Sequence, residues 1–414
     1  MIRGATRFVL LAAASLVAAL AMPADAAPDP AFTAFLQSVW PDAQKFGIAR
    51  ATFDNAVRGL EPDLGLPDLV VPGRVQKQPG QPEFVQTPAD YLKESSFTRL
   101  TERGRKLREQ YRDVFARIEK EFGVPGPVVL AIWGRESDYS THYGGRDAIQ
   151  MVATQAYTGR RKDYFRDQLL WALKMLQDGI PRGEMRSSWG GAMGLTQFLP
   201  SEFYKYGVDF DGDHKVDIWN SVPDALASAA KQLVGEGWER DKPWAYEVRV
   251  PAEVDCTIAD PDRKMPLSEW LKRGFALSYG RKAPARDLAE PASLLLPAGT
   301  HGPGFLIFHN YFVIKEYNFS DLYVLFVGHL SERIDDPRPF ETAWSKNTQL
   351  RTAQVESMQR TLTKIGLYKD KIDGKAGMLT RAALGAYQKA NRLKVDCWPT
   401  AAVLDDMQRK SAIK

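Results

Sequence analysis

The sequence predicts a mainly helical protein of the α+β class, in which a large helical domain contains a small β insertion and a small three-helix domain follows. Apolar residues recur at helical spacing through most of the chain up to about residue 240. Between about residues 244 and 315 the pattern changes to short runs rich in β-branched and aromatic residues, which favour strands. The Pro-containing segment 335–339 then precedes roughly seventy residues with three short helical patterns.

Gly and Pro residues mark the ends of the expected helices. Helical structure is expected at 30–59, at 89–121 with a break at Gly104, and at 127–136, 164–178, 225–235, 266–273, 320–334, 353–365, 379–391 and 401–407. The expected strands are 246–250, 293–296 and 305–314, and a long loop is expected from 61 to 88. These elements predict a main domain at 28–335 with its β-containing part at about 244–315, a linker at 336–346 and a C-terminal domain at 347–412.

Residues 1–27 are predicted to be a signal peptide. Arg3 and Arg7 precede the apolar run 8–21, and small residues at 24–26 suit cleavage. The run is too short for a comfortable membrane span, and no Cys follows it that could carry a lipid. We therefore expect an exported, periplasmic protein without a stable membrane anchor.

Composition and charge narrow the class of partner. The chain has 414 residues, enough for two or three domains, and a net charge of only +4. Because no basic stripe with interleaved aromatic residues is present, nucleic acid is not expected as a partner. The 10 Trp and 15 Tyr residues suit the faces of sugars, although such rings are also ordinary core residues.

The two cysteines, Cys256 and Cys397, fall in different predicted domains. Export to an oxidising compartment permits a bridge between them, but their spacing does not argue for one. Two buried or free thiols are the expectation.

Glu136 and a glycine-rich loop form the strongest candidate for a chemical site. Glu136 ends the apolar helical pattern, where Ile132 and Trp133 are expected to desolvate its carboxyl group and raise its pKa. The loop at 188–200, Ser-Trp-Gly-Gly-Ala-Met-Gly-Leu-Thr-Gln-Phe-Leu-Pro, is too rich in Gly for a helix and too aromatic for a solvated linker. A carboxyl group on a rigid helix beside such a loop indicates a site that binds a sugar and protonates it.

Most glycosidases need a second carboxylate, and none stands out in this sequence. Asp138 lies two residues after Glu136 and is expected to point elsewhere, whereas Asp147 and Asp163 stay open as candidates. One carboxyl group is enough if the substrate supplies its own nucleophile, which N-acetylmuramic acid can do through its C6 hydroxyl group.

An ordered set of motifs resembles the lytic murein transglycosylase B family, which cleaves peptidoglycan. The set covers roughly residues 30–335 in the order expected for the family, and this order is far more specific than any single motif. The motifs are Gln81-Pro82-Glu83-Phe84, Gly134-Arg135-Glu136-Ser137, Arg160-Arg161 before Tyr164-Phe165, Gly191-Ala192-Met193-Gly194, Gln197-Phe198-Leu199-Pro200-Ser201, Asp209-Phe210-Asp211-Gly212-Asp213, Asp217-Ile218-Trp219-Asn220-Ser221 and Tyr317-Asn318.

This resemblance implies a lysozyme-like, mostly helical catalytic domain with Glu136 as its single catalytic residue. Glu136 would protonate the glycosidic oxygen between N-acetylmuramic acid and N-acetylglucosamine, and its carboxylate would then accept the proton of the muramoyl C6 hydroxyl group. That hydroxyl group attacks C1 and closes a 1,6-anhydro ring, so the reaction consumes no water and requires no cofactor. The residues that the family implies for binding the sugars are Ser188, Gln197, Tyr317, Asn318 and Tyr323.

The acidic loop at 209–217 has the first half of a calcium-binding pattern, with hard oxygen ligands at alternate positions. It departs from that pattern because His214 replaces the Gly of the sharp turn and Asn220 replaces the closing Glu. The family resemblance implies that a later Asp closes the site. The expected ligands of a structural Ca²⁺ are Asp209, Asp211, Asp213, Lys215 and Asp224, and an acidic turn without an ion is the alternative.

The C-terminal domain resembles the peptidoglycan-binding domain of type one. The matching residues are Gln359, Leu362, Gly366, Tyr368, Ile372, Asp373, Gly374, Gly377, Thr380, Ala383, Tyr387, Gln388, Pro399 and Thr400. Cys397-Trp398 departs from the family, in which a Gly commonly follows the Asp. Such a domain would raise the local concentration of an enzyme on an insoluble polymer.

The leading hypothesis is an exported lytic transglycosylase whose partner is the glycan strand of peptidoglycan, with other wall enzymes as further candidate partners. One alternative is a muramidase that hydrolyses with water, which needs a second carboxylate near Glu136. Another alternative is a non-catalytic wall-binding protein, and the intact set of Glu136, Ser188 and Gln197 argues against it.

Overall fold

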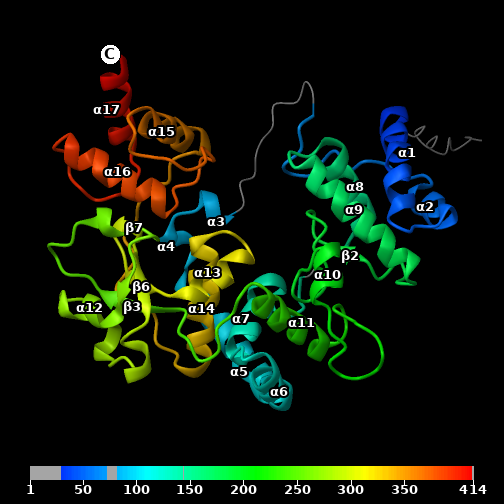
Figure 1. Ribbon diagram of the computed structural model, residues 1–414, viewed down its shortest axis with the longest axis horizontal. Coiled ribbons are helices and arrows are strands. Elements are labelled where there is room, and N and C mark those ends of the chain that lie inside the picture. Colours follow the sequence, from blue (N-terminus) through cyan, green and yellow to red (C-terminus); the bar gives the residue numbers. More distant parts are fainter. Residues whose placement is uncertain (1–28, 72–81, 143, 413–414) are drawn as a thin grey trace, which may run out of the picture.

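The computed structural model describes residues 29–71, 82–142 and 144–412, and helices predominate in it, as predicted (Figure 1). The predicted signal peptide and Gln81 lie outside the described residues. Figure 1 shows an N-terminal helical lobe, a central helical bundle beside a small sheet, and C-terminal helices packed over the sheet.

The N-terminal lobe combines the first two helices with three helices from the middle of the chain. Its helices are α1 (Pro30–Lys45), α2 (Arg50–Val57), α8 (Ala148–Thr158), α9 (Lys162–Gln177) and α10 (Pro200–Tyr206). The helical stretch expected at 30–59 is present but divided into α1 and α2, because the chain turns at Gly47, whose φ of +84° favours glycine. Helix α8 was not predicted, because it is buried on almost every side and so shows no amphipathic period.

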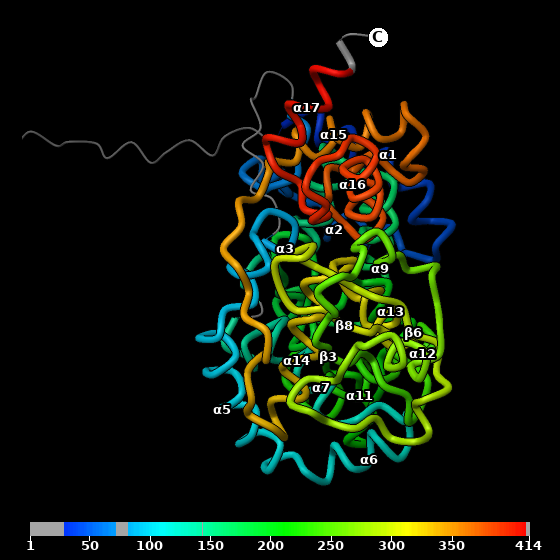
Figure 2. Tube along the Cα trace, turned by 90° about the vertical axis from the view of Figure 1, so that its left-hand side faces the viewer, coloured from blue at the N-terminus to red at the C-terminus, as the bar shows by residue number. Residues whose placement is uncertain are grey.

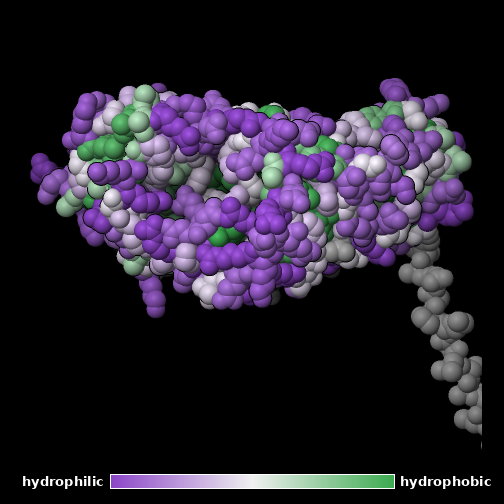
Figure 3. Space-filling view, turned by 90° about the horizontal axis from the view of Figure 1, so that it is seen from below, coloured by the Kyte–Doolittle hydropathy of each residue, from purple (hydrophilic) through white to green (hydrophobic). Residues whose placement is uncertain are grey.

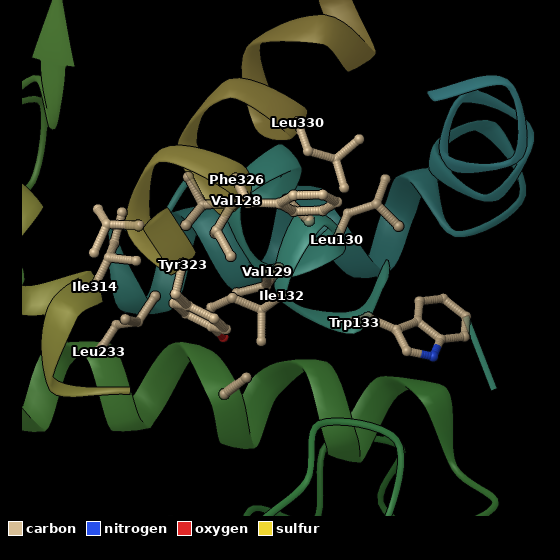
Figure 4. Packing of buried hydrophobic residues seen from close by; sticks show 14 of the residues in the cluster. Val128, Val129, Leu130, Ile132, Trp133, Leu233, Ile314, Tyr323, Phe326 and Leu330 are labelled. Atoms are coloured by element: carbon tan, nitrogen blue, oxygen red, sulfur yellow. The ribbon is translucent and has the colours of Figure 1, made fainter. Parts of the chain in front are cut away.

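The central bundle surrounds one buried helix. Its helices are α5 (Glu94–Gln110), α6 (Arg112–Phe122), α7 (Gly126–Ser137), α11 (Val222–Gly235) and α14 (Asp321–Asp335). Figure 4 shows Val128, Val129 and Ile132 of α7 packed against Tyr323 and Phe326 of α14, with α11 on the other side. Burying these side chains contributes about 1.5–3 kcal/mol each, so packing holds α7 firmly within the bundle.

Two short helices stand where a loop was expected, namely α3 (Pro82–Val85) and α4 (Pro88–Tyr91). The helix expected at 89–121 is interrupted at Tyr111, between α5 and α6, rather than at Gly104. Gly104 lies within α5, where a Cβ atom would lie 2.6 Å from Oη of Tyr139, so a larger residue would displace that ring.

The small sheet has five antiparallel strands in the order β4-β6-β8-β3-β5. The strands are β3 (Ala245–Arg249), β4 (Met265–Pro266), β5 (Ala276–Leu277), β6 (Pro291–Leu295) and β8 (Gly304–Ile307), with β7 (Pro297–Thr300) outside the sheet and β1 (Arg146–Asp147) paired with β2 (Arg186–Ser187) elsewhere. The expected strand 305–314 is wrong beyond Ile307, because the chain continues as helix α13 (His309–Glu316). Its β-branched and aromatic residues favour a strand locally, but as a helix they point into the central core.

Short helical turns complete this β-containing part, at η1 (Cys256–Ile258), η2 (Ser278–Gly280), η3 (Ala285–Asp287) and α12 (Leu267–Lys272). Residues 336–350 form no helix or strand, yet Phe340 and Trp344 pack against the central core. The segment between α14 and the C-terminal helices is therefore held along the protein surface.

The C-terminal domain consists of α15 (Thr352–Lys364), α16 (Met378–Ala390) and α17 (Ala401–Ala412), as predicted. It sits beside α3 and the sheet in two perpendicular views (Figures 1 and 2). A disulfide joins Cys256 in η1 to Cys397 of this domain, so the expectation of two thiols is wrong. Spacing could not reveal the bridge, because its two cysteines are 141 residues apart and meet only when α16 packs against η1.

Among the residues that the structure describes, no helix is long and apolar enough to cross a membrane. The face seen from below is largely hydrophilic, with hydrophobic side chains in small separate patches (Figure 3).

Candidate active site

Helix α7 positions Glu136 at its last turn. Pro127 starts the helix in its first turn, and the following apolar residues fix it in the bundle. The helix ends where Asp138 adopts a left-handed φ of +50°, so Glu136 lies at a rigid helix end beside an abrupt turn. The carboxyl group of Glu136 is partly buried.

Tyr323 of α14 donates a hydrogen bond of 2.5 Å from its Oη to Oε1 of Glu136. The ring of Tyr323 is fully buried and stacks on the ring of Tyr317, with 6.2 Å between centroids and 9° between planes. Burial and the nearby charge of Glu136 raise the pKa of Tyr323, which keeps its hydroxyl group protonated as a donor. Among the described residues, none donates a hydrogen bond to Oε2, which is left free to exchange a proton with a substrate.

Burial raises the pKa of Glu136 above its usual value, as the sequence predicted. The charge of Arg135 and the hydrogen bond from Tyr323 oppose this rise, whereas the charge of Glu83 adds to it. Arg135 is itself held by Tyr91 of α4, whose hydroxyl oxygen accepts from Nη2 at 2.6 Å. Some neighbours of Glu136 therefore raise its pKa and others lower it. Such a balance suits a group that first donates a proton and then accepts one.

The glycine-rich loop joins the two helical cores beside Glu136. Met193 and Phe198 pack in the N-terminal lobe, whereas Leu195 packs in the central bundle. Ser137, next to Glu136, donates a hydrogen bond of 2.7 Å to the carbonyl oxygen of Leu195. Gly194 has a φ of +72°, and a Cβ atom there would lie 2.5 Å from a backbone oxygen of Ile218, so only Gly fits this turn.

Ser188 and Gln197, the two predicted sugar-binding residues of this loop, are partly exposed on it. The turn at Ser188 is closed by a hydrogen bond from its backbone N–H to the Ala192 carbonyl oxygen at 2.8 Å. Gln197 adopts a φ of +60°, and its Nε2 donates to the Gly194 carbonyl oxygen at 3.0 Å. The loop thus carries a hydroxyl group and an amide group on two successive turns, 188–192 and 194–197.

Tyr317 and Asn318 lie on the connection between α13 and α14. Tyr317 donates a hydrogen bond of 2.8 Å to the carbonyl oxygen of Thr196, which ties this connection to the glycine-rich loop. The Oδ1 atom of Asn318 is buried and accepts no hydrogen bond from the described residues. An unpaired buried acceptor is costly unless a ligand supplies a donor, so this atom fits a sugar hydroxyl or amide group.

The structure brings Glu136, Tyr323, Tyr317 and the glycine-rich loop together, although 187 residues separate the two members of the Glu136–Tyr323 pair.

The carboxylates considered in the sequence as a second catalytic group are otherwise engaged or remote. Asp138 pairs with Arg99 at 2.6 Å, and Asp147 caps α8 and pairs with Arg182 at 2.6 Å. Asp163 lies in the first turn of α9 and is exposed.

Sequence reasoning missed two other carboxylates that act on the site. Glu83 is buried on α3, and its charge raises the pKa of Glu136. Burial raises the pKa of Glu202 to about 7, and the charge of Glu136 contributes to this rise. Glu83 belongs to the family motif Gln81-Pro82-Glu83-Phe84, which could have indicated a role near the site. No sequence feature distinguishes Glu202 in the same way.

The acidic loop places part of the predicted calcium-binding set together. Carboxylate oxygens of Asp209, Asp211 and Asp213 lie within 4.8 Å of one another, and all three residues are exposed. His214 adopts a φ of +71°, so the missing Gly does not prevent the turn.

Asp224 has a different task from the one expected. Its two carboxylate oxygens accept hydrogen bonds from the backbone N–H groups of Phe210, Asp211 and Asp217, at 2.8 to 3.2 Å. It shapes the loop from beneath and does not belong to the cluster of three aspartates.

The chain matches two protein families, one in each of its two main parts. Residues 31–332 match the Transglycosylase SLT domain family, and residues 351–407 match a peptidoglycan binding domain family. Membrane-bound lytic murein transglycosylase B of Escherichia coli (strain K12) is 28% identical over 227 residues, which are 54% of this chain and 61% of that protein. The match therefore spans less than two thirds of that relative.

Two solved structures from Pseudomonas aeruginosa share the fold. SltB3 in complex with NAG-anhNAM-pentapeptide is 38% identical, with a TM-score of 0.81 over 92% of this chain and 100% of that chain. Soluble lytic transglycosylase SltB1 is 25% identical, with a TM-score of 0.59 over 75% of this chain and 99% of that chain. The mainly helical, lysozyme-like fold class predicted from the sequence is confirmed.

Proposed function

The chain belongs to the Transglycosylase SLT domain family, and we propose that it is a lytic transglycosylase acting on peptidoglycan. It cleaves the β-1,4 bond between N-acetylmuramic acid and N-acetylglucosamine and leaves a 1,6-anhydro end. The proposal rests on Glu136, whose carboxyl group accepts a hydrogen bond from Tyr323 at the junction of two helical cores. The structure of SltB3, 38% identical, is a complex with NAG-anhNAM-pentapeptide, which supports the same substrate class for this chain.

The first step uses Glu136 as a general acid. Burial raises its pKa, which favours the protonated form that the leaving glycosidic oxygen requires. Tyr323 occupies Oε1, so the proton to be transferred is carried by Oε2. As the proton leaves, the hydrogen bond from Tyr323 stabilises the carboxylate that forms.

The second step uses the same group as a general base. The carboxylate of Glu136, stabilised by Arg135 and Tyr323, accepts the proton of the muramoyl C6 hydroxyl group. The C6 oxygen attacks C1 and closes the anhydro ring, and Glu136 regains the proton with which it began. The proton count closes without water.

The sugar-binding residues are proposed on their positions around Glu136. Ser188 and Gln197 offer a hydroxyl and an amide group on the glycine-rich loop, which suit the N-acetyl and hydroxyl groups of the substrate. Asn318 offers its buried Oδ1, which accepts no hydrogen bond from the described residues, next to Tyr317. Tyr317 and Tyr323 present a stacked pair of rings between them.

A muramidase that uses water is the alternative, and Glu83 is the carboxylate that it would need. Glu83 is buried and acts electrostatically on Glu136. We assign Glu83 a supporting role, because it is only 7% exposed and acts on Glu136 through its charge.

A structural Ca²⁺ is proposed at the acidic loop, held by Asp209, Asp211 and Asp213 together with the backbone carbonyl group of Lys215. Three converging carboxylates supply hard oxygen ligands of the kind that Ca²⁺ prefers. The ion would stiffen the loop and take no part in the proton transfers. Asp224 supports the loop through backbone amides instead of closing the site.

The periplasm is the proposed location. Peptidoglycan lies outside the cytoplasmic membrane, and the Cys256–Cys397 disulfide fits an oxidising compartment. The C-terminal domain is proposed to bind the glycan strands of the same polymer.

Mass spectrometry of digested peptidoglycan tests the proposal. The wild type is expected to release muropeptides with anhydro ends, each one water lighter than the corresponding reducing sugar. Glu136→Gln keeps the size and hydrogen bonding of the side chain but carries no transferable proton, so it is expected to release none. Reducing ends from the wild type, or full activity of Glu136→Gln, would contradict the proposal.

A further inference from the structure

A buried ion pair connects the C-terminal domain to the helix that carries Tyr323. Nη2 of Arg381, on α16, lies 2.9 Å from Oδ2 of Asp321, at the start of α14. Each of the two side chains is only 9% exposed. Desolvating such a pair costs free energy, so its presence between two domains calls for a specific role.

Asp321 is also the point at which α13 and α14 are joined. Its Oδ1 atom accepts hydrogen bonds from Tyr311 at 2.8 Å and Lys315 at 2.6 Å, both on α13. Arg381 takes the remaining oxygen, and its Nη1 donates to the carbonyl oxygen of Ala376 in its own domain. One carboxylate therefore fixes three helices, and the third belongs to the C-terminal domain.

The active-site residues lie within a few positions of this carboxylate. Tyr317 and Asn318 precede it, and Tyr323, the donor to Glu136, follows two residues later. Ser320 caps α14 by accepting hydrogen bonds from the backbone N–H groups of Leu322 and Tyr323. Asp321 and Tyr323 therefore lie in the same capped first turn of α14.

The same part of the C-terminal domain also contacts α3, the helix that carries Glu83. Lys375 lies over Phe84 on α3, next to Glu83. Residues 375–381 thus contact both α3, which carries Glu83, and α14, which carries Tyr323. Figure 1 shows α3 next to the C-terminal helices. A pocket of about 300 Å³ lies between these surfaces.

Other contacts already attach the domain at a distance from the site. The Cys256–Cys397 disulfide joins it to η1, and Lys389 pairs with Asp255 at 2.7 Å on the surface. Because attachment does not depend on Arg381, the buried pair is available for a separate task.

We propose that Arg381 is a positioning residue for the lytic reaction: through Asp321 the C-terminal domain sets the segment 317–323 against Glu136. The domain thereby contributes to turnover as well as to retention on the wall. This inference rests on the proposed function, because it concerns the alignment of the same catalytic pair.

Turnover of a soluble substrate separates alignment from wall binding. The probe is a purified glycan tetrasaccharide of alternating N-acetylglucosamine and N-acetylmuramic acid, whose anhydro product is quantified by mass spectrometry. The full chain carries Arg381→Met, Arg381→Lys or, as a matched control, Lys389→Met, which removes the exposed interdomain pair at Asp255. Thermal unfolding is measured for each variant.

Arg381→Met is expected to lower kcat by about tenfold or more with little change in KM, since small misplacements of catalytic groups carry such losses. Arg381→Lys, which keeps the charge but not the second hydrogen bond, is expected to lie between wild type and Arg381→Met. Lys389→Met is expected to keep the wild-type kcat.

A wild-type kcat in Arg381→Met, or an equal loss in Lys389→Met, overturns the inference. If Arg381→Met does not fold, Arg381→Lys decides the matter, and a wild-type kcat in it has the same meaning. An inactive wild type would instead contradict the proposed function itself.

Discussion

Replacing Tyr323 by Phe isolates the hydrogen bond to Glu136. The ring is fully buried and stacked on Tyr317, so Phe retains its packing and removes only the hydroxyl group that lies 2.5 Å from Oε1. A hydrogen bond to a charged group contributes about 1.5–3 kcal/mol, which corresponds to a fall in kcat of about tenfold to a hundredfold if the forming carboxylate loses it.

The pH dependence of the variant gives the sharper test. The Tyr323 hydrogen bond favours the carboxylate and so lowers the pKa of Glu136, against the larger effect of burial, which raises it. Without the hydrogen bond from Tyr323, less counteracts the effect of burial, so the pKa of Glu136 is expected to rise further. Because the acid step needs protonated Glu136, the alkaline limb of the kcat/KM profile is expected to move to higher pH.

The assay is anhydro-product formation from a soluble glycan across the pH range, for wild type, Tyr323→Phe and Tyr317→Phe. Tyr317→Phe is the matched control, because it loses a hydrogen bond to Thr196 and none to Glu136. Its alkaline limb is expected to stay in place. If the alkaline limb of Tyr323→Phe moves to lower pH, or if its kcat is unchanged, the Tyr323 hydroxyl group does not stabilise the carboxylate of Glu136 during the reaction.

Three further predictions address the second carboxylate, the disulfide and the acidic loop. Glu83→Gln removes a charge that raises the pKa of Glu136, so the alkaline limb should move to lower pH. Its kcat should fall by less than about tenfold, far short of the roughly 10²–10⁴-fold effect of a general base, and complete inactivity would favour the muramidase. Replacing both Cys256 and Cys397 by Ala opens a loop whose ends are 141 residues apart. The greater chain entropy of the unfolded state is expected to lower the free energy of unfolding by up to about 5 kcal/mol, as measured by denaturant titration. An unchanged denaturation midpoint would show that the disulfide does not stabilise the protein. Adding Ca²⁺ should raise Tm in wild type but not in Asp213→Asn, with Mg²⁺ as the control, and equal shifts in both proteins would rule out the proposed ligand set.

The sequence predicted the parts of the site that depend on local pattern. Helix α7 is marked by a dense apolar run with Pro in its first turn, and Glu136 stands at its end. The glycine-rich loop was readable because Gly at positions such as 194 is required by a left-handed turn against a neighbouring backbone.

The sequence did not reveal what arises only from packing between distant segments. Helix α8 lacks an amphipathic period because it is enclosed on nearly all sides, and α13 has a strand-like composition that the central core overrides. The Cys256–Cys397 bridge likewise needs the C-terminal domain in place.

Electrostatic partners were the least predictable features. The influence of Glu83 on Glu136 depends on the position of α3 within a segment expected to be a loop. Asp224 fits a ligand pattern in the sequence, yet both of its oxygens face backbone amides. Spacing along the chain does not reveal which way a carboxylate points.

Glu136 is proposed to act alone, with the substrate as the source of the nucleophile. This can be tested by digesting peptidoglycan in heavy-oxygen water and analysing the released muropeptides by mass spectrometry. Anhydro ends without heavy oxygen are expected, because no water enters the reaction. Heavy oxygen at C1 of the muramoyl sugar would show instead that water is the nucleophile.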